Sequence, residues 1–369
     1  MATEDAVLLP AEQLHQFMTD VFCFAGVPAG DAKIVADVLI ASDLRGIESH
    51  GVQRLRMYYD RIKAGILQPV TRPETVKESP TTAVIDGHDG MGHVIGVHSM
   101  NLAVQKARDF GMGAVAVRNS SHFGIAGYYA LMAVRAGMIG LVVTNTRPSI
   151  APTFGVQPLL GTNPIAFGAP TDEDCPYLFD AATSIIQRGK VEVLARAKKP
   201  ASPGWVINQV GQPATDADEI LKGLNKDTHS LLPIGGYGEQ FGGHKGYGLS
   251  TVVEILSASL QMGLFLHNLM GIDENGKARP HRIGHFFMAV NIENFLPLAE
   301  FRKTTGEILR ELRSSRKAPG EKRIYTANEK EYENEFRVRR EGVPIIADLQ
   351  KDLIYLRNEA GLFQYQFPF

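Results

Sequence analysis

The chain has 369 residues, of which 44% are hydrophobic and 21% are charged, and its formal net charge at pH 7 is −2. This length and composition predict a globular protein of about two domains with a large core. The small net charge gives no electrostatic reason to expect binding to nucleic acid or to a membrane surface. Small molecules and protein partners remain as the expected ligands.

Cysteine content and hydropathy indicate the cellular compartment in which the protein is expected. Cys23 and Cys175 are the two cysteines, so the sequence predicts no disulfide framework. The start M-A-T-E-D lacks the basic and apolar regions of a secretory signal. Because no apolar run approaches the ~20 residues needed to cross a bilayer, we expect a cytoplasmic protein without a membrane span.

Both ends of the chain have helical patterns, and the middle alternates strands with helices. Helices are predicted at residues 11–25, 31–43 and 50–64. A linker at 68–80 follows, and helical patterns return at 300–315 and 342–360, separated by a charged surface excursion at 317–340.

The third predicted helix carries the first candidate site. Ser49 is a plausible N-cap, and His50, Arg54 and Tyr58 recur every four residues, which places them on one face. A histidine beside an arginine suits an anion, because the guanidinium offers paired donors and the helix start adds partial positive charge. The alternative is a solvated basic face, to which Arg45, Arg56 and Arg61 would contribute.

His122 is the second candidate. The apolar run 113–117 indicates a buried strand, and 126–136 has helical composition, so His122 lies in a turn at the carboxyl end of a strand. Loops at that edge carry chemistry while the sheet holds them in place. The placement suits a catalytic histidine, and the alternative is a loop histidine bonded to the backbone.

A Rossmann fingerprint is rejected. After a strand at 82–86 the glycines are spaced G-x-G-x-x-x-G, a helix follows at 97–108, and no acidic residue ends the next strand. Further strands at 139–144, 165–169 and 177–179 predict a mixed sheet.

The glycine-rich region 234–248 precedes a helix that runs through residues 255 and 260. Backbone amides at a helix start bind anions, so Lys245 and its glycines predict a phosphate site, with a mobile surface loop as the alternative. A Walker loop is excluded because Gly246, not Ser or Thr, follows the lysine.

No metal site is expected. His281 and His285 stand four apart on a predicted strand, where that spacing does not converge. The chain also lacks the G-x-S-x-G and C-x-x-C patterns of serine hydrolases and of dithiol or zinc enzymes.

Five segments in a fixed order carry a family resemblance. They are D-L-R-G-I-E-S-H-G-V-Q-R at 43–54, S-S-H-F-G-I-A-G-Y-Y at 120–129, G-T-N-P-I-A-F-G at 161–168, D-A-A-T-S at 180–184 and G-G-H-K-G-Y-G-L at 242–249. Together they resemble the malate/L-lactate dehydrogenase family, which also contains sulfolactate and ureidoglycolate dehydrogenases, and they are most similar to its malate dehydrogenases. The match runs from about residue 8 to 345.

The resemblance implies a mixed α/β, L-sulfolactate dehydrogenase-like fold and usually a homodimer. A non-Rossmann nucleotide-binding and catalytic domain at 76–289 would join a helical domain built from 1–75 and 290–369. The site would lie between them.

The resemblance also implies residue roles. His122 matches the proton acceptor, with His50 as a second catalytic residue. Ser49 and Arg54 match substrate-binding positions. The positions that hold the dinucleotide are Thr146, Asp180, Ala181, Ala182 and Lys245, to which we add Asn163 because G-T-N-P breaks the chain at a strand entrance. One departure is T-A-N-E at 326–329, where the family commonly has P-G-E.

These expectations define a reaction. An oxidoreductase would transfer a hydride between NAD, or alternatively NADP, and a small 2-hydroxy acid, with malate/oxaloacetate favoured over lactate or sulfolactate. Reduction of a cyclic imine or a ureidoglycolate-type substrate is the closer alternative. A racemase or lyase that uses the histidine without a dinucleotide, and a non-catalytic binding protein, are the others.

Overall fold

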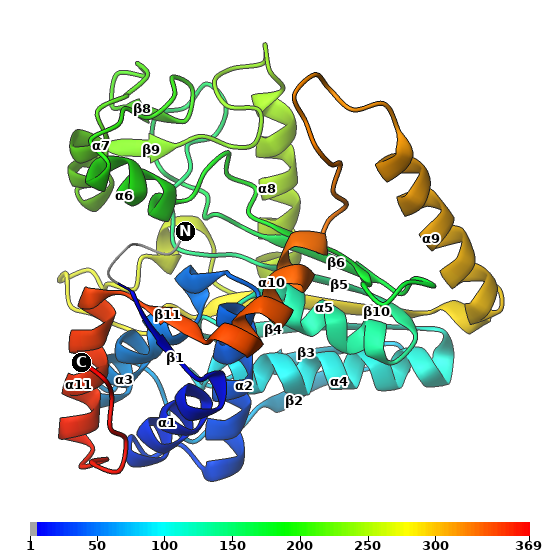
Figure 1. Ribbon diagram of the computed structural model, residues 1–369, viewed down its shortest axis with the longest axis horizontal. Coiled ribbons are helices and arrows are strands. Elements are labelled where there is room, and N and C mark those ends of the chain that lie inside the picture. Colours follow the sequence, from blue (N-terminus) through cyan, green and yellow to red (C-terminus); the bar gives the residue numbers. More distant parts are fainter. Residues whose placement is uncertain (1–5) are drawn as a thin grey trace.

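The computed structural model describes residues 6–369, and it has a mixed α/β fold (Figure 1). Residues 1–5, to which the expectation about a secretory signal refers, lie outside this range. Within 6–369, the main sheet has seven strands in the order β2-β3-β4-β10-β5-β6-β7. They are β2 (Glu74–Glu78), β3 (Thr82–Asp86), β4 (Met112–Ser120), β5 (Met138–Thr144), β6 (Ile165–Ala169), β7 (Tyr177–Ala181) and β10 (Ile283–Asn291).

The pairing of this sheet separates it from the Rossmann fold. β3 and β4 run parallel, whereas the other neighbouring pairs of the described sheet are antiparallel. A Rossmann sheet is parallel throughout its nucleotide-binding half. The mixed sheet agrees with the absence of the dinucleotide fingerprint from the sequence.

Helices cover both faces of the sheet. Along β4, Val115 and Val117 join the core that α4 (Gly92–Phe110) and α5 (Ala126–Arg135) build on one face. Ala116 between them packs with Val253 of α8 (Gly243–Ala258) on the other. The alternation follows from the two-residue period of a strand. Because both faces are buried, the strands read as continuous apolar runs.

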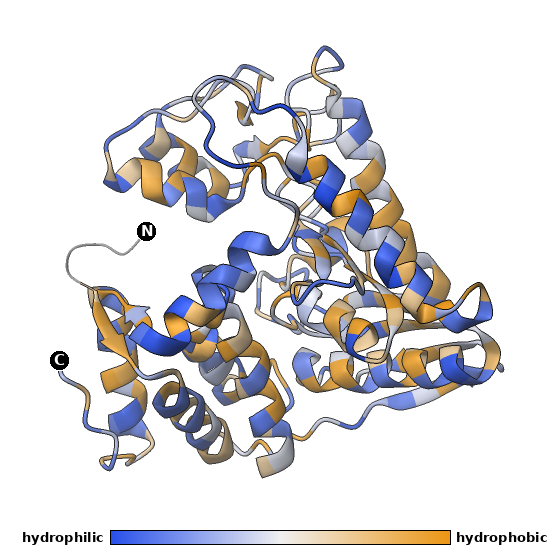
Figure 2. Cartoon of the chain, turned by 45° about the vertical axis from the view of Figure 1, so that its right-hand side comes forward, coloured by the Kyte–Doolittle hydropathy of each residue, from blue (hydrophilic) through white to orange (hydrophobic). Residues whose placement is uncertain are grey.

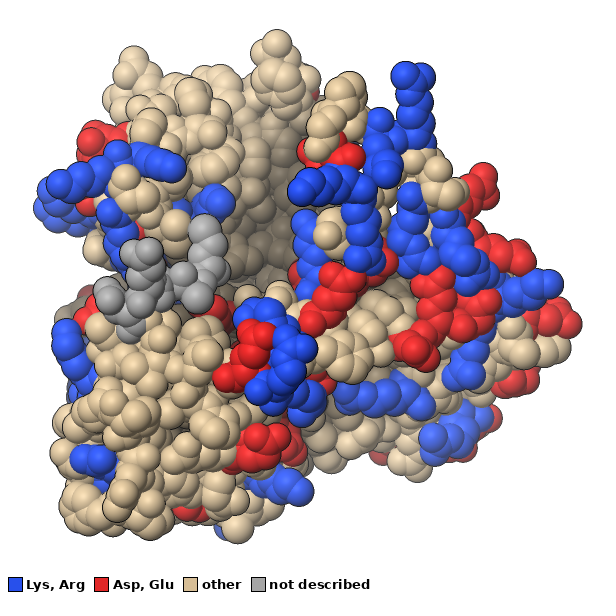
Figure 3. All heavy atoms as spheres, in the orientation of Figure 1, with Lys and Arg blue, Asp and Glu red and all other residues tan. Residues whose placement is uncertain are grey.

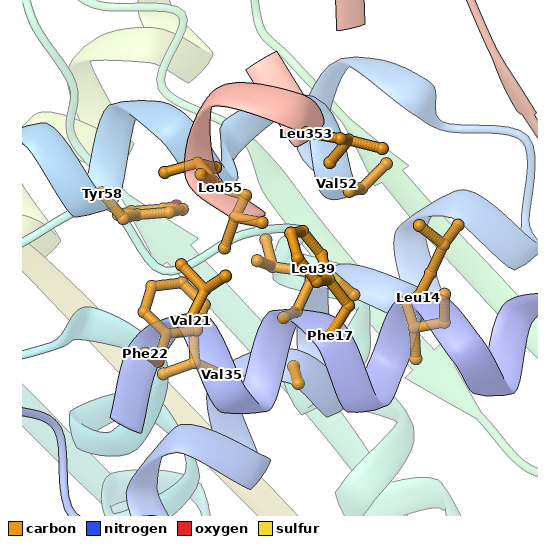
Figure 4. Close-up of a cluster of buried hydrophobic side chains, with 14 of the residues drawn as sticks. Leu14, Phe17, Val21, Phe22, Val35, Leu39, Val52, Leu55, Tyr58 and Leu353 are labelled. Atoms are coloured by element: carbon orange, nitrogen blue, oxygen red, sulfur yellow. The ribbon is translucent and has the colours of Figure 1, made fainter. Parts of the chain in front are cut away.

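The two ends of the chain form a second core. β1 (Val7–Leu9) pairs with β11 (Val343–Ile345), and α11 (Ala347–Glu359) packs beside α1 (Ala11–Phe24), α2 (Ala29–Leu44) and α3 (Leu55–Lys63). Leu14, Phe17 and Val21 recur on the inward face of α1 and meet Leu39 and Leu353 (Figure 4). α3 forms the outer wall of the candidate site. Its residues Leu55 and Tyr58 belong to this second core, so the core supports that wall.

A lobe that the sequence patterns did not predict is inserted in the chain between β7 and β10. It contains α6 (Arg188–Arg196), β8 (Val206–Asn208), α7 (Ala217–Asn225) and β9 (His229–Leu231), and it has its own core around Val206 and Ile220. Short elements separated by Gly, Pro and charged residues give weak periodic signals, which explains why the lobe was missed.

The late helices differ in position. α9 (Leu298–Ser314) lies at the far edge of the main sheet, while α10 (Glu329–Glu341) lies across α2 (Figure 1). Figure 2 colours most of α10 hydrophilic, in keeping with its charged sequence. The segment at 317–340, predicted as a charged surface excursion, is helical over its second half, which the sequence did not indicate.

Other boundaries also differ from the predictions. The predicted linker contains β2, and α4 begins five residues before the predicted 97–108 helix. The predicted helix at 50–64 is divided: two 3₁₀ turns, η1 (Glu48–His50) and η2 (Val52–Arg54), precede α3. Ser49 is therefore not an N-cap, since Arg54 occupies that position of α3 without a side-chain cap.

The remaining 3₁₀ turns are η3 (Ser259–Gln261), η4 (Leu266–Leu269) and η5 (Ile292–Asn294). In the described part of the chain, none of the helices has the length and apolar character required to span a bilayer.

Candidate active site

The loop that carries His122 follows β4 and leads into α5, the strand-to-helix turn that the sequence predicted. Ser121 clamps the loop onto the start of α4, because its hydroxyl accepts from Gly92 N–H at 2.8 Å and donates to Gly90 O at 2.9 Å. A Cβ atom on Gly92 would lie 2.2 Å from Ser121 O, so only glycine permits this contact. The histidine is thus held on rigid elements.

His122 meets two side chains from the helical core. The Tyr58 hydroxyl is hydrogen-bonded to His122 Nδ1, and the His50 ring stacks on the His122 ring with centroids 5.4 Å apart. A hydroxyl both donates and accepts, so Tyr58 matches Nδ1 whether or not that nitrogen carries a proton. Nε2 is left as the nitrogen for a substrate.

The electrostatic surroundings keep both histidines neutral. Burial, the neighbouring His50 and His93, and the guanidinium groups of Arg54 and Arg61 hold the pKa of His122 well below its usual value. Burial and Arg54 lower the pKa of His50 to about 4. Within residues 6–369 neither ring has a carboxylate partner. An arriving anion would therefore be the first negative charge beside His122.

Two 3₁₀ turns bring Ser49, His50 and Arg54 together. Ser49 Oγ lies 2.8 Å from His50 Nδ1, and Arg54 Nε donates to Ser49 O at 2.6 Å. The two terminal nitrogens of Arg54 have no protein partner among the described residues. The predicted convergence of these residues is therefore real, although it arises from turns and not from one regular helix.

A buried carboxylate shapes these turns. Asp43 is 1% exposed and its Oδ2 accepts from Val52 N–H at 2.8 Å. Burial raises the pKa of Asp43 well above its usual value. A Cβ atom on Gly51 would lie 1.9 Å from Asp43 Oδ1, so the glycine allows the chain to fold over the carboxylate. Asp43 was inside a recognised motif but had no predicted role.

Asn163 and Thr146 lie together on the other side of the sheet. Asn163 is fully buried: its Oδ1 accepts from Thr146 N–H at 3.2 Å, and its Nδ2 donates to Glu254 at 2.8 Å and to Ser250 O at 3.1 Å. Thr146 Oγ1 in turn accepts from Thr162 N–H at 2.9 Å. Asn163 thus ties the half-exposed Thr146 loop to α8, which is a positioning role.

The D-A-A run ends β7 beside the helix that follows His122. Asp180 accepts from Gly127 N–H, in the first turn of α5, at 2.7 Å. Burial raises the pKa of Asp180 to about 6. Ala181 and Ala182 are half-exposed, and Thr183 Oγ1 then donates to Thr162 O at 3.1 Å. The run therefore connects the His122 side of the site with the Thr146 side.

Lys245 lies in the first turn of α8 and not in a loop. It is exposed, and α8 starts from Gly242 in a left-handed conformation (φ +85°) without a side-chain cap. An uncapped helix start beside a lysine fits the diphosphate of a dinucleotide. Figure 3 shows a deep hollow between the lobe of α6 and α7 and the segment leading into α10, with Lys and Arg side chains along one border.

Residues 326–329, where this sequence has T-A-N-E in place of the family's P-G-E, hold the start of α10 in position. Asn328 accepts from Arg45 at 2.6 Å and donates to Pro176 O at 2.9 Å. Glu329 lies 3.2 Å from Arg313 and 2.8 Å from Arg323. These contacts attach the start of α10 to the sheet and to the end of α2.

Two further histidines, His285 and His281, have structural partners. His285 lies between Thr144 Oγ1 and Ser120 Oγ, at 2.7 and 2.8 Å, and burial lowers its pKa to about 3. His281 bonds Leu269 O and Arg61. No group of three His, Cys, Asp or Glu side chains arranged to hold a metal occurs in residues 6–369.

Three neighbours of His122 were not given a role in the predicted site. Tyr58 was placed on the correct face but given no role, and Arg61 was counted among the solvated arginines. Arg54, Tyr58 and Arg61 stand at positions i, i+4 and i+7, a spacing that marks one helix face. His93 packs edge-on against Tyr58 with ring centroids 4.8 Å apart, and no local pattern indicated it.

Comparison with known proteins identifies the class. The family model for malate/L-lactate dehydrogenase matches residues 9–354. The chain therefore belongs to the malate/L-lactate dehydrogenase family. It is 44% identical to a malate dehydrogenase of Pyrococcus horikoshii over 97% of both chains. It is 38% identical to an L-sulfolactate dehydrogenase of Methanocaldococcus jannaschii over 96% of this chain and 98% of the relative. The crystal structure of malate dehydrogenase from Entamoeba histolytica superposes with a TM-score of 0.94 at 43% identity, covering 99% of this chain and all of the other.

Proposed function

We propose that this protein transfers a hydride between a nicotinamide dinucleotide and a small 2-hydroxy acid, with malate/oxaloacetate as the favoured pair. The observation that carries the proposal is a half-buried, neutral His122 bonded to Tyr58, with the open guanidinium of Arg54 beside it. The malate dehydrogenases among its relatives favour malate over lactate and sulfolactate.

The residues divide the work of the reaction. On oxidation, His122 Nε2 takes the proton of the substrate hydroxyl, and Tyr58 accepts from Nδ1–H of the resulting imidazolium. Arg54 binds the substrate carboxylate through its two terminal nitrogens. His50 stacks on His122 and is hydrogen-bonded to Ser49, so it forms one wall of the site. The nicotinamide, when bound, supplies or accepts the hydride.

The dinucleotide would be held by the Thr146 loop, the Asp180–Ala182 run and the start of α8 with Lys245. Asn163 would position the first of these. We favour NAD over NADP as the nucleotide. We favour the cytoplasm as the compartment, because Cys23 and Cys175 are free thiols.

We also infer a homodimer. The family resemblance supports it, and the exposed apolar side chains Val252 and Ile255 on α8 offer unpartnered surface. Light scattering should report about twice the 40.3 kDa chain mass. An active monomer of that mass would contradict the inference.

A substrate screen tests the function. Purified protein should oxidise NADH or NADPH, followed by near-ultraviolet absorbance, with oxaloacetate as the best of oxaloacetate, pyruvate, sulfopyruvate, the oxo form of ureidoglycolate and a cyclic imine. A best rate with the imine would favour the reductase alternative. No turnover with any 2-oxo acid and either nucleotide would refute the dehydrogenase, and proton exchange without nucleotide would indicate a racemase or lyase.

A further inference from the structure

The arginines around the substrate side of the site fall into two kinds. Arg45 and Arg56 have acidic or amide partners: Arg45 bonds Asn328 and lies 3.9 Å from Glu335. Arg56 pairs with Asp60 and Asp352 at 3.1 and 3.3 Å, and its guanidinium stacks on a tyrosine. Their charges are neutralised within the protein.

Arg54 and Arg61 are different. Both are half-buried, and neither has a carboxylate within salt-bridge distance among residues 6–369. Arg54 donates to a backbone carbonyl, and Arg61 lies 3.3 Å from His281 Nε2. Burial lowers the pKa of Arg61, and Arg54 adds to that lowering. A half-buried guanidinium without a counter-charge is costly, and such groups are normally paired.

His281 holds Arg61 in place without neutralising it. His281 Nδ1 lies 3.0 Å from Leu269 O, so the ring proton is on Nδ1 and the lone pair of Nε2 faces the guanidinium. Arg61 therefore keeps its full charge and several free donors. Tyr58 and Arg61 lie one turn apart on α3, and Arg54 is the residue at its N-cap. Both charges act on His122 and on the Tyr58 hydroxyl.

We propose that Arg61 binds the second acid group of the substrate, so that the site selects 2-oxo acids with two anionic groups, such as C4 dicarboxylates and three-carbon sulfonates, over monocarboxylates. The inference rests on the proposed dehydrogenase function. One carboxylate would neutralise Arg54 and leave Arg61 buried and uncompensated. A dianion would neutralise both of these arginines, which lack an acidic partner among residues 6–369 and whose charges act on the Tyr58–His122 pair.

Substrate selectivity of matched variants tests this assignment. The ratio of kcat/KM for oxaloacetate to kcat/KM for pyruvate is measured for the wild type, Arg61→Gln, Arg61→Lys and the control Arg56→Gln. Arg61→Gln should lower kcat/KM for oxaloacetate by about 10- to 100-fold, the range of one charge-assisted hydrogen-bonded contact, and change the pyruvate value by less than about threefold. Arg61→Lys should fall in between, and Arg56→Gln should leave the ratio unchanged.

The outcomes separate the two proposals. An unchanged ratio in Arg61→Gln, an equal fall with both acids, or the same change in Arg56→Gln would overturn the role of Arg61 while leaving the dehydrogenase intact. A wild type that turns over neither acid with either nucleotide would overturn the proposed function first. If Arg61→Gln does not fold, Arg61→Lys keeps the charge and the fold, and an unchanged ratio and KM there would overturn a directional contact.

Discussion

His122 is surrounded by positive and neutral groups. This distinguishes it from catalytic histidines that are hydrogen-bonded to a carboxylate. Its neighbours are Tyr58, His50, His93 and two guanidinium groups. The neutral ring is thus the resting form, ready to accept a proton. In the direction of reduction, His122 must be protonated before it can donate its proton. The negative charge of the bound substrate would raise the pKa of His122 and so stabilise the imidazolium.

The first prediction concerns this residue. His122→Ala should lower kcat by ~10²-fold or more, because a general acid–base group is lost, while dinucleotide affinity stays near wild type. Steady-state kinetics and nucleotide fluorescence titration measure the two quantities. An unchanged kcat would return His122 to a structural role, and a matching loss of nucleotide affinity would indicate a misplaced loop.

The second prediction tests how Arg54 holds the carboxylate. Arg54→Lys keeps the charge but loses the planar fork and the bond to Ser49 O, so KM for the 2-oxo acid should rise by the equivalent of ~1 to 3 kcal/mol. Dinucleotide KM should hardly move. A substrate KM within about twofold of wild type, a change below ~0.5 kcal/mol, would reject the clamp.

At the scale of elements, the sequence predicted the substrate-side convergence but not its cause. A four-residue helical spacing was expected to align His50 with Arg54. In the structure, Gly51 (ψ −141°) interrupts the helix between them, and Asp43 holds the resulting pair of turns. Local periodicity could not reveal this, because the stabilising contact joins positions nine residues apart through a buried carboxylate.

The third prediction addresses these turns. Gly51→Ala should displace Asp43 and lower the free energy of unfolding by ~1 to 3 kcal/mol, together with a fall in kcat/KM for the 2-oxo acid, because overpacking shifts the backbone. Gly30 in α2 is the control, since a Cβ atom there meets nothing within 4 Å. Gly30→Ala should be neutral or stabilise. Urea unfolding measures both variants, and equal stability of the two would contradict the role of the turn.

The sheet was predicted better than its surroundings. The strands at 82–86 and 165–169 match the structure at both ends, and α5 ends one residue before its predicted end. Their signals are continuous apolar runs bounded by Gly, Pro or Asn. β10 was recognised as a strand, but its place between β4 and β5 is a long-range pairing that no local pattern encodes. The charged helix α10 was missed because it buries little apolar surface.

For the whole molecule, the buried histidines set a limit on acid stability. His50, His93 and His285 have folded-state pKa values of about 4, 3 and 3, all below the unfolded value near ~6.5, and that of His122 is also depressed. The unfolded chain therefore binds more protons as the pH falls below ~6.5, and stability is lost in that direction. Above that pH these histidines are neutral in both the folded and the unfolded state, so they do not make the free energy of unfolding depend on pH.

The fourth prediction follows. The free energy of unfolding should fall between about pH 6.5 and pH 4, by up to ~1.4 kcal/mol per pH unit for each histidine that remains neutral in the native state. Urea unfolding at a series of pH values measures this. His285→Gln, which keeps a hydrogen-bonding side chain between Ser120 and Thr144, should make the slope shallower. A stability that is flat over this interval would contradict the prediction.

The pairing of β1 with β11 and the packing of α11 on α1–α3 have a consequence for biosynthesis. The N-terminal helices are complete by Lys63, yet their partner helix starts at Ala347. At about 5–20 residues per second, the ribosome needs about 15–60 s to make the intervening segment. During that delay the apolar face of α1 has no partner and is a binding surface for chaperones. The α3 wall of the site acquires its full support only when α11 emerges.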